Sequence, residues 1–181
     1  MSKIFMEKWR QNLTAILLMF SSVLIDGFIA NNFTSTLDTS LGLVVPRTIV
    51  LMIIILSFHY KEGFMLGSAA AFGFIMDSYY LGFLGVYMPS LVLVAYLTYS
   101  LKRVIHPNVL SYTLIGILGI TLVEIIAYGI MRILAITTIP IQYFIVSRLS
   151  ATLLFNGIVM FLFSYFIHLL IVNIIEESQL R

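Results

Sequence analysis

The stretch that decides the fold is Gly63–Tyr99, GFMLGSAAAFGFIMDSYYLGFLGVYMPSLVLVAYLTY, in which Asp77 closes a run of small residues. Glycine and alanine recur there at four-residue spacing, which on an α-helix makes a smooth surface that another helix can approach closely. We call this surface the small-residue strip and define it as Gly63, Gly67, Ala69, Ala71 and Gly73. It is expected to pack against another helix, either within the chain or from a partner.

The composition indicates an integral membrane protein. Of 181 residues, 61% are hydrophobic and 10% are charged, whereas soluble domains carry about 25% charged residues. The apolar runs are continuous rather than alternating, which favours helices over a β-barrel. With roughly 20 residues per crossing, we expect an all-α polytopic protein of about six transmembrane helices.

These helices are expected to form one transmembrane domain over residues 1–181. The predicted spans are about 11–33, 46–60, 63–78, 82–101, 109–134 and 148–172. The last apolar region begins earlier, at Ile141, and is longer than one crossing requires. Its first turns therefore either lie along the membrane surface or extend a tilted helix.

The basic residues indicate the orientation. With six spans and a cytoplasmic N-terminus, seven of them face the cytoplasm: Lys3, Lys8, Arg10, Lys61, Lys102, Arg103 and Arg181. The opposite side then holds three: Arg47, Arg132 and Arg148. This asymmetry follows the positive-inside rule and places both termini in the cytoplasm.

Several charged residues fall in or near apolar segments. We call one group, at the outer end of the predicted bundle, the predicted polar lock: Asp26, Arg47, Asp77, Arg132 and Arg148. Charges at membrane depth usually face inward and pair, so the lock is expected to join helices, with a partner-binding surface or a transport or catalytic site as alternatives. Glu124 lies deeper, as a buried acid that is either neutral and hydrogen-bonded or a functional carboxylate.

The sequence favours a protein without catalysis. The chain has no cysteine, its net charge of +2 does not indicate nucleic-acid binding, and its three histidines lack the spacing of metal ligands. Phosphate-binding loops, nucleophile motifs and HExxH sequences are absent from it. We therefore expect no enzyme activity, no cofactor, no metal and no nucleic-acid partner.

Two segments resemble the MreD family of rod-shape-determining proteins. That family has a helix of the form GxxxGxxxGxxxD, then a short loop with Leu-Gly and a long apolar helix, and the matching positions here are Gly63, Gly67, Gly73, Asp77, Leu81 and Gly82. The final segment, SATLLFNGIVMFLFSYFIHLL, is similar to the family's last helix, with Asn156 after a leucine pair. Ala69–Ala71, between the glycines, is a mild departure from the pattern.

The resemblance implies a multi-pass protein of the bacterial cytoplasmic (inner) membrane that takes part in cell-wall elongation. It also implies a non-enzymatic scaffold that binds a single-span MreC-like protein and supports peptidoglycan synthases. A coupling of about 1–3 kcal/mol would be enough for such a scaffold to bias a partner's conformation.

A transporter is the alternative. The architecture is also similar to the substrate-binding subunits of energy-coupling-factor vitamin transporters, which need an outward-facing pocket. Such a pocket could be lined by Asp26, Arg47, Asp77, Tyr79, Tyr80 and Arg148. Those subunits usually carry an Ala-x-x-x-Ala docking patch in the first helix, where this chain has Ala15 and then Met19.

Overall fold

The computed structural model describes residues 2–32, 38–39, 42–82, 85–105 and 108–179. The main helices are α1 (Ser2–Asn32), α3 (Thr48–His59), α4 (Glu62–Met76), α5 (Tyr87–Leu101), α6 (Val109–Ile133) and α8 (Ser150–Gln179). Short elements complete them: the π-helical η1 (Asp77–Leu81) and η2 (Phe144–Leu149), the single turn α7 (Ile141–Tyr143), and the strands β1 (Asp38–Thr39) and β2 (Gly42–Leu43). Apart from this two-stranded antiparallel ribbon, the described chain is helical, which confirms the all-α class.

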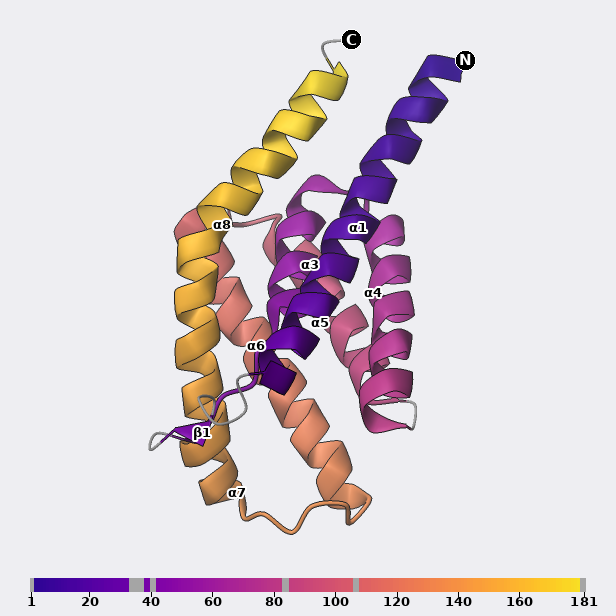
Figure 1. The fold of residues 1–181 in the computed structure, drawn as a ribbon. Helices are drawn as coiled ribbons and strands as arrows, with labels where there is room; N and C mark the ends of the chain where they lie inside the picture. The colour runs from indigo at the N-terminus through magenta and orange to yellow at the C-terminus, as the bar shows by residue number, and fades with distance from the viewer. Residues whose placement is uncertain (1, 33–37, 40–41, 83–84, 106–107, 180–181) are drawn as a thin grey trace.

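The last helix is continuous, which favours one of the two alternatives left open by the sequence. α7, η2 and α8 follow one another without a break from Ile141 to Gln179, so the early turns extend the helix instead of forming a separate surface segment. Figure 1 shows both chain ends at one end of the bundle and α7 with the β-ribbon at the other.

Three described helical stretches are long and apolar enough to cross a membrane: Trp9–Asn32, Val109–Ile133 and Ile141–Leu162. α3 and α5 are apolar but shorter. The 12 residues of α3 rise only about 18 Å, against a hydrocarbon core of about 30 Å. α3 is therefore too short to span that core alone, and its start, preceded by Arg47, lies beside residues well inside α1, α6 and α8.

α3 is the centre of the bundle. Its sequence TIVLMIIILSFH has no polar stripe, and a helix that is apolar on all sides is stable only when it is surrounded by other elements. Residues 49–57 are all buried, and α1, α4, α5, α6 and α8 each contact this helix.

α4 packs most extensively on α5, and Gly73 is the point of closest approach. A Cβ atom placed on Gly73 would lie 2.4 Å from the Cα of Met88 and 2.8 Å from its backbone nitrogen. Backbone cannot yield as a side-chain tip can, so only glycine allows α4 and α5 this close.

The close contact at Gly73 and the open space at Gly67 predict different effects of substitution at these two glycines of α4. Gly73→Ala is expected to lower the free energy of unfolding by about 1–3 kcal/mol, because α5 must move away. Gly67→Ala, where an added Cβ meets nothing within 4 Å, is expected to be neutral or to stabilise by up to about 1 kcal/mol through helix propensity. Thermal unfolding in detergent, followed by circular dichroism, measures both; equal midpoints for the two variants would contradict the packing described here.

Candidate functional site

Asp26 of α1 caps the N-terminus of α3. Its Oδ1 accepts hydrogen bonds from the backbone N–H of Thr48 and from the Thr48 hydroxyl, both at 2.8 Å, and Oδ2 accepts from the N–H of Ile49 at 3.2 Å. The first N–H groups of a helix have no partner within it, and a carboxylate also matches the positive end of the helix dipole. A helix that begins inside the bundle needs such a cap, because each enclosed N–H group without an acceptor costs free energy.

Asn156 and Thr152 of α8 hold the segment that leads into α3. Asn156 accepts a hydrogen bond from the backbone N–H of Arg47 at 2.8 Å and donates to the carbonyl of Val45 at 2.8 Å. The Thr152 hydroxyl accepts from the N–H of Val45 at 3.1 Å. Hydrogen bonds to α1 and α8 thus hold this segment from two sides and position the Arg47 side chain.

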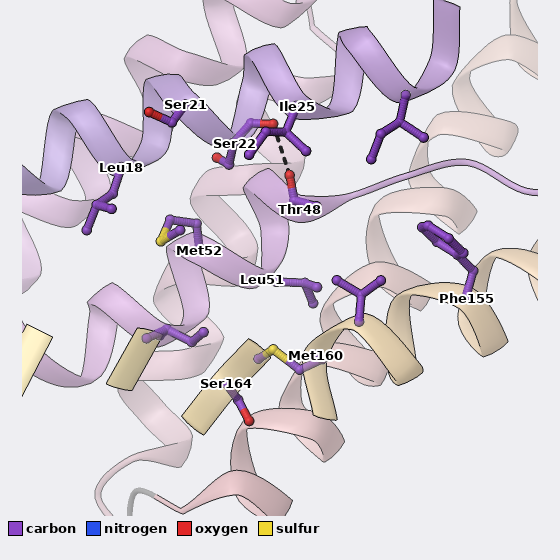
Figure 2. Close-up of a pocket in the computed structure, with 13 residues that line it drawn as sticks. Leu18, Ser21, Ser22, Ile25, Thr48, Leu51, Met52, Phe155, Met160 and Ser164 are labelled. Atoms are coloured by element: carbon purple, nitrogen blue, oxygen red, sulfur yellow. Dashed lines mark hydrogen bonds between the residues drawn. The ribbon is translucent and has the colours of Figure 1, made fainter. Parts of the chain in front are cut away.

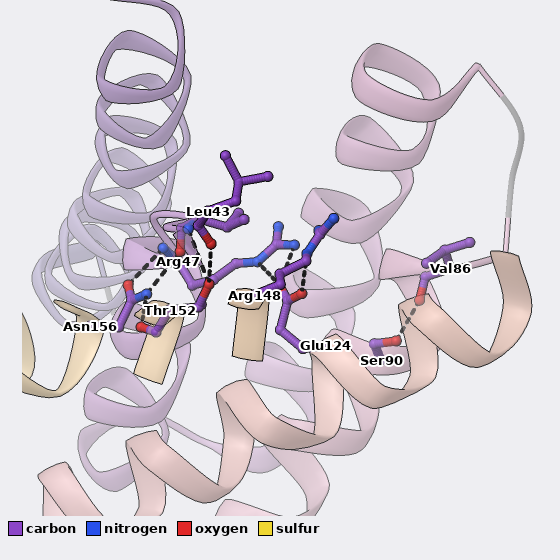
Figure 3. Close-up of polar contacts among 9 residues, drawn as sticks. Leu43, Arg47, Val86, Ser90, Glu124, Arg148, Thr152 and Asn156 are labelled. Atoms are coloured by element: carbon purple, nitrogen blue, oxygen red, sulfur yellow. Dashed lines mark hydrogen bonds and ion pairs between the residues drawn. The ribbon is translucent and has the colours of Figure 1, made fainter. Parts of the chain in front are cut away.

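Arg47 and Arg148 converge on Glu124 of α6 (Figure 3). The Nε and Nη2 atoms of Arg47 lie 2.7 and 2.5 Å from Oε1, and the Nε of Arg148 lies 3.1 Å from Oε2. We call these three residues the charge triad. It joins the start of α3, the middle of α6 and η2, which are far apart in the sequence.

The triad is shielded from solvent on the Glu124 side. The Glu124 side chain is 1% exposed and that of Arg47 5%, whereas that of Arg148 is 32% exposed. The guanidinium carbon of Arg47 also lies 5.0 Å from the ring centre of Tyr87, a cation–π distance. Two arginines against one glutamate leave one net positive charge, and the Arg148 end of the triad is its accessible part.

Asp77 performs for α5 the role that Asp26 performs for α3. It is fully buried and accepts from the backbone N–H groups of Gly85 at 2.9 Å, Tyr87 at 2.7 Å and Met88 at 3.2 Å. Three donors from the start of α5 therefore share one carboxylate. This bonds the end of α4 to the neighbouring helix at the level of the charge triad.

The predicted polar lock is thus corrected in its pairing. Asp26 and Asp77 cap helices, and among the described residues neither forms an ion pair with the arginines. Arg132 lies exposed and donates to the carbonyl of Thr137 at 3.3 Å, on its own side of the turn after α6. Glu124, expected to be a neutral acid or a functional carboxylate, is instead the partner of Arg47 and Arg148.

The small-residue strip divides between two faces of α4. Ala69 and Gly73 are buried, whereas Gly63, Gly67 and Ala71 are exposed. An added Cβ at Gly63 or Gly67 meets nothing within 4 Å. One part of the strip therefore serves internal packing, and the other part faces away from the rest of the described chain.

A separate cavity of about 310 Å³ lies between α1, α3 and α8 (Figure 2). Its walls are mainly aliphatic, aromatic and methionine side chains. The hydroxyls that reach it are hydrogen-bonded within the chain; for example, Ser22 donates to the carbonyl of Met19 at 2.7 Å. This cavity suits only an apolar occupant.

Sequence reasoning missed the roles of Asn156, Thr152 and Tyr87. Asn156 has a signal, since an amide in an apolar helix costs free energy unless it is hydrogen-bonded. Nothing in the sequence indicates that its partner is the backbone around Arg47. The assembled group of caps, amide and ion pairs can join helices and bind an anion, and the triad contains no hydroxyl or thiol nucleophile.

Comparison with known proteins agrees with the motifs. The family model described as rod shape-determining protein MreD matches residues 10–174. The sequence is also 28% identical over 113 residues to the rod shape-determining protein MreD of Bacillus subtilis (strain 168), an alignment covering 62% of this chain and 66%, just under two thirds, of that relative. No solved structure matches the chain.

Proposed function

Because the chain belongs to the MreD family of rod shape-determining proteins, we propose that it is a non-enzymatic scaffold of the machinery that elongates the bacterial cell wall. It acts by holding an MreC-like single-span membrane protein, and through it peptidoglycan synthases, in one arrangement. The observation that carries this proposal beyond family membership is the exposed part of the small-residue strip on α4.

The proposed placement is in the bacterial cytoplasmic membrane, with six crossings and both termini in the cytoplasm. Chain ends at one end of the bundle (Figure 1) support an even number of crossings. α3 and α5 are short for a crossing, but their capped N-termini are enclosed by protein, and enclosed ends are tolerated at membrane depth. The basic residues favour the cytoplasm for the end that carries the termini.

The proposed partner surface is the exposed face of α4. Gly63, Gly67 and Ala71 lie one turn apart on this face and have no side chain beyond a methyl group. Association of helices in lipid depends on close packing because lipid tails are as apolar as leucine. A face without bulk, and without a neighbour in the described chain, is suited to a second helix from another protein.

One observation weighs against the transporter alternative. That alternative needs a docking patch on the first helix, and the register available in α1 offers Ala15 and Met19. Both side chains are 0% exposed, so this part of α1 faces the bundle. The scaffold proposal requires no docking patch on α1.

A capture experiment tests the scaffold. The protein is co-expressed with an MreC-like single-span protein and purified, and the partner retained per mole is measured. Gly67→Leu is expected to reduce retention at least tenfold, because a leucine prevents close approach on the α4 face. Gly129→Leu is the matched control, since Gly129 on α6 also has open space around it.

Two results would contradict the scaffold proposal. One is equal retention of the partner by the Gly67 and Gly129 variants, which would remove α4 as the partner surface. The other is native mass spectrometry that detects a small vitamin-like metabolite and no protein partner, which would favour the transporter.

A further inference from the structure

We propose that this protein binds one anionic phospholipid at the end of the bundle that carries the charge triad, with the headgroup beside Arg148 and an acyl chain between α1 and α4. The site combines a charged pocket with an apolar groove. It is distinct from the exposed α4 glycines and does not depend on the scaffold role.

The headgroup pocket has a volume of about 250 Å³. Its polar lining comes from Asp26, Arg47, Tyr80, Tyr87 and Arg148. Asp26 already accepts three hydrogen bonds from the start of α3. Its carboxylate is therefore not the acceptor for the arginine N–H groups. The negative charge of Asp26 faces the positive N-terminal end of the α3 dipole, so the donors left unused in this pocket are those of the arginines.

Both arginines have donor capacity that Glu124 does not use. Arg148 contacts Glu124 through Nε, which leaves its two terminal nitrogens for another acceptor. Arg47 is 4% exposed, and its buried Nη2, although close to Oε1, makes no well-directed hydrogen bond. Guanidinium groups bind phosphate oxygens through such paired N–H donors.

An apolar groove of about 800 Å³ continues from this pocket between α1 and α4–η1. Ala30 and Tyr80 line both spaces, so the pocket and the groove meet at these residues. Farther along, the groove is lined by Phe20, Leu24 and Ile75. The polarity therefore changes from charged to apolar along one path, as it does along a phospholipid.

The length of the groove favours an acyl chain over a transmembrane helix as its occupant. From Phe20 to Asn31, both of which line it, α1 rises about 17 Å. Half of a hydrocarbon core of about 30 Å is about 15 Å, so the groove is one leaflet deep. A transmembrane helix would need twice that depth, whereas an acyl chain needs only this much. The net positive charge of the triad favours an anionic over a zwitterionic lipid.

Binding is tested on the purified protein without any partner, by native mass spectrometry with phosphatidylglycerol and phosphatidylcholine of identical chains. The protein is expected to retain phosphatidylglycerol at least tenfold better. Arg148→Gln should abolish this preference, while Arg132→Gln, which removes an arginine outside the pocket, should leave it unchanged. Ala30→Phe fills the junction at an exposed position, and should lower retention of both lipids.

Each alternative gives a distinct result that would overturn the proposal. Equal retention of the two lipids, or equal losses for Arg148→Gln and Arg132→Gln, would exclude recognition by the triad. Displacement of the lipid by inorganic phosphate at similar concentration would identify a soluble anion as the ligand. An Ala30→Phe variant that loses an MreC-like partner but no lipid would show that a protein occupies the groove.

Discussion

Replacing Glu124 by glutamine is expected to lower the free energy of unfolding by about 3–5 kcal/mol, the cost of leaving a buried charge without its partner. Glutamine keeps the shape of the side chain and an acceptor oxygen, so the loss reports the missing negative charge. Arg47 would then lie buried beside Arg148 without its ion-pair partner. The chain has no cysteine for thiol-reactive dyes, so circular dichroism in detergent is the appropriate measurement.

Arg132→Gln is the control for this prediction, because Arg132 is exposed and bonds only within its own turn among the described residues. Its effect is expected to stay within about 0.5 kcal/mol. A triple variant that replaces Arg47 and Arg148 by methionine and Glu124 by leucine should lose less stability than Glu124→Gln alone, because removing all charges leaves none unpaired. A Glu124→Gln variant as stable as Arg132→Gln would contradict the structural role of the triad.

Asp77→Ala is expected to cost about 2–3 kcal/mol, above most of the range of about 0.5–2 kcal/mol for ordinary helix caps. The larger value follows because three backbone N–H groups of one helix start depend on this carboxylate and each unsatisfied buried donor is costly. Asp77→Asn should fall between the wild type and Asp77→Ala, since it keeps one acceptor oxygen.

The control for Asp77 is Glu62→Gln, at an exposed position in the first turn of the same helix. It changes the same net charge but removes no buried acceptor, so its unfolding midpoint should match that of the wild type. If Glu62→Gln and Asp77→Asn shift the midpoint equally, the loss reflects overall charge and not the cap.

The two buried caps and the triad have a common cause in the short helices. α3 and α5 contain 12 and 15 residues, and both begin inside the bundle, α3 beside Asp26 of α1 and α5 beside Arg47. Their unsatisfied N–H groups lie in protein, and side chains from other helices must supply the acceptors. The buried charged residues of the described chain, Asp26, Arg47, Asp77 and Glu124, lie at these helix starts, two as caps and two as an ion pair.

The helical class and the importance of Asp77 could be predicted from residue type alone. In a continuous apolar run, the backbone N–H and C=O groups can form all their hydrogen bonds within a helix. A carboxylate in such a run needs a hydrogen-bond donor or a counter-charge. The same reasoning expected Arg47 and Arg148 to pair within a group whose acids are Asp26 and Asp77, and left open which acid pairs with which arginine; the structure gives both arginines to Glu124. That reasoning placed Arg47 at the outer end of the bundle and Glu124 deeper, whereas the structure brings the two side chains into contact.

By itself, the sequence determined that the chain is helical and apolar, that its small residues permit close packing, and that its few charges need partners. Only the tertiary structure decided which partners these are: helix starts for Asp26 and Asp77, and Glu124 for the two arginines. The physical reason is that residue type decides whether a charged side chain needs a partner, whereas the depth of each side chain in the bundle decides which residue can be that partner. Depth is set by where each helix begins in three dimensions. For the stretch Gly63–Tyr99, this means that Gly73 and Asp77 bind α4 to α5, while Gly63 and Gly67 remain open.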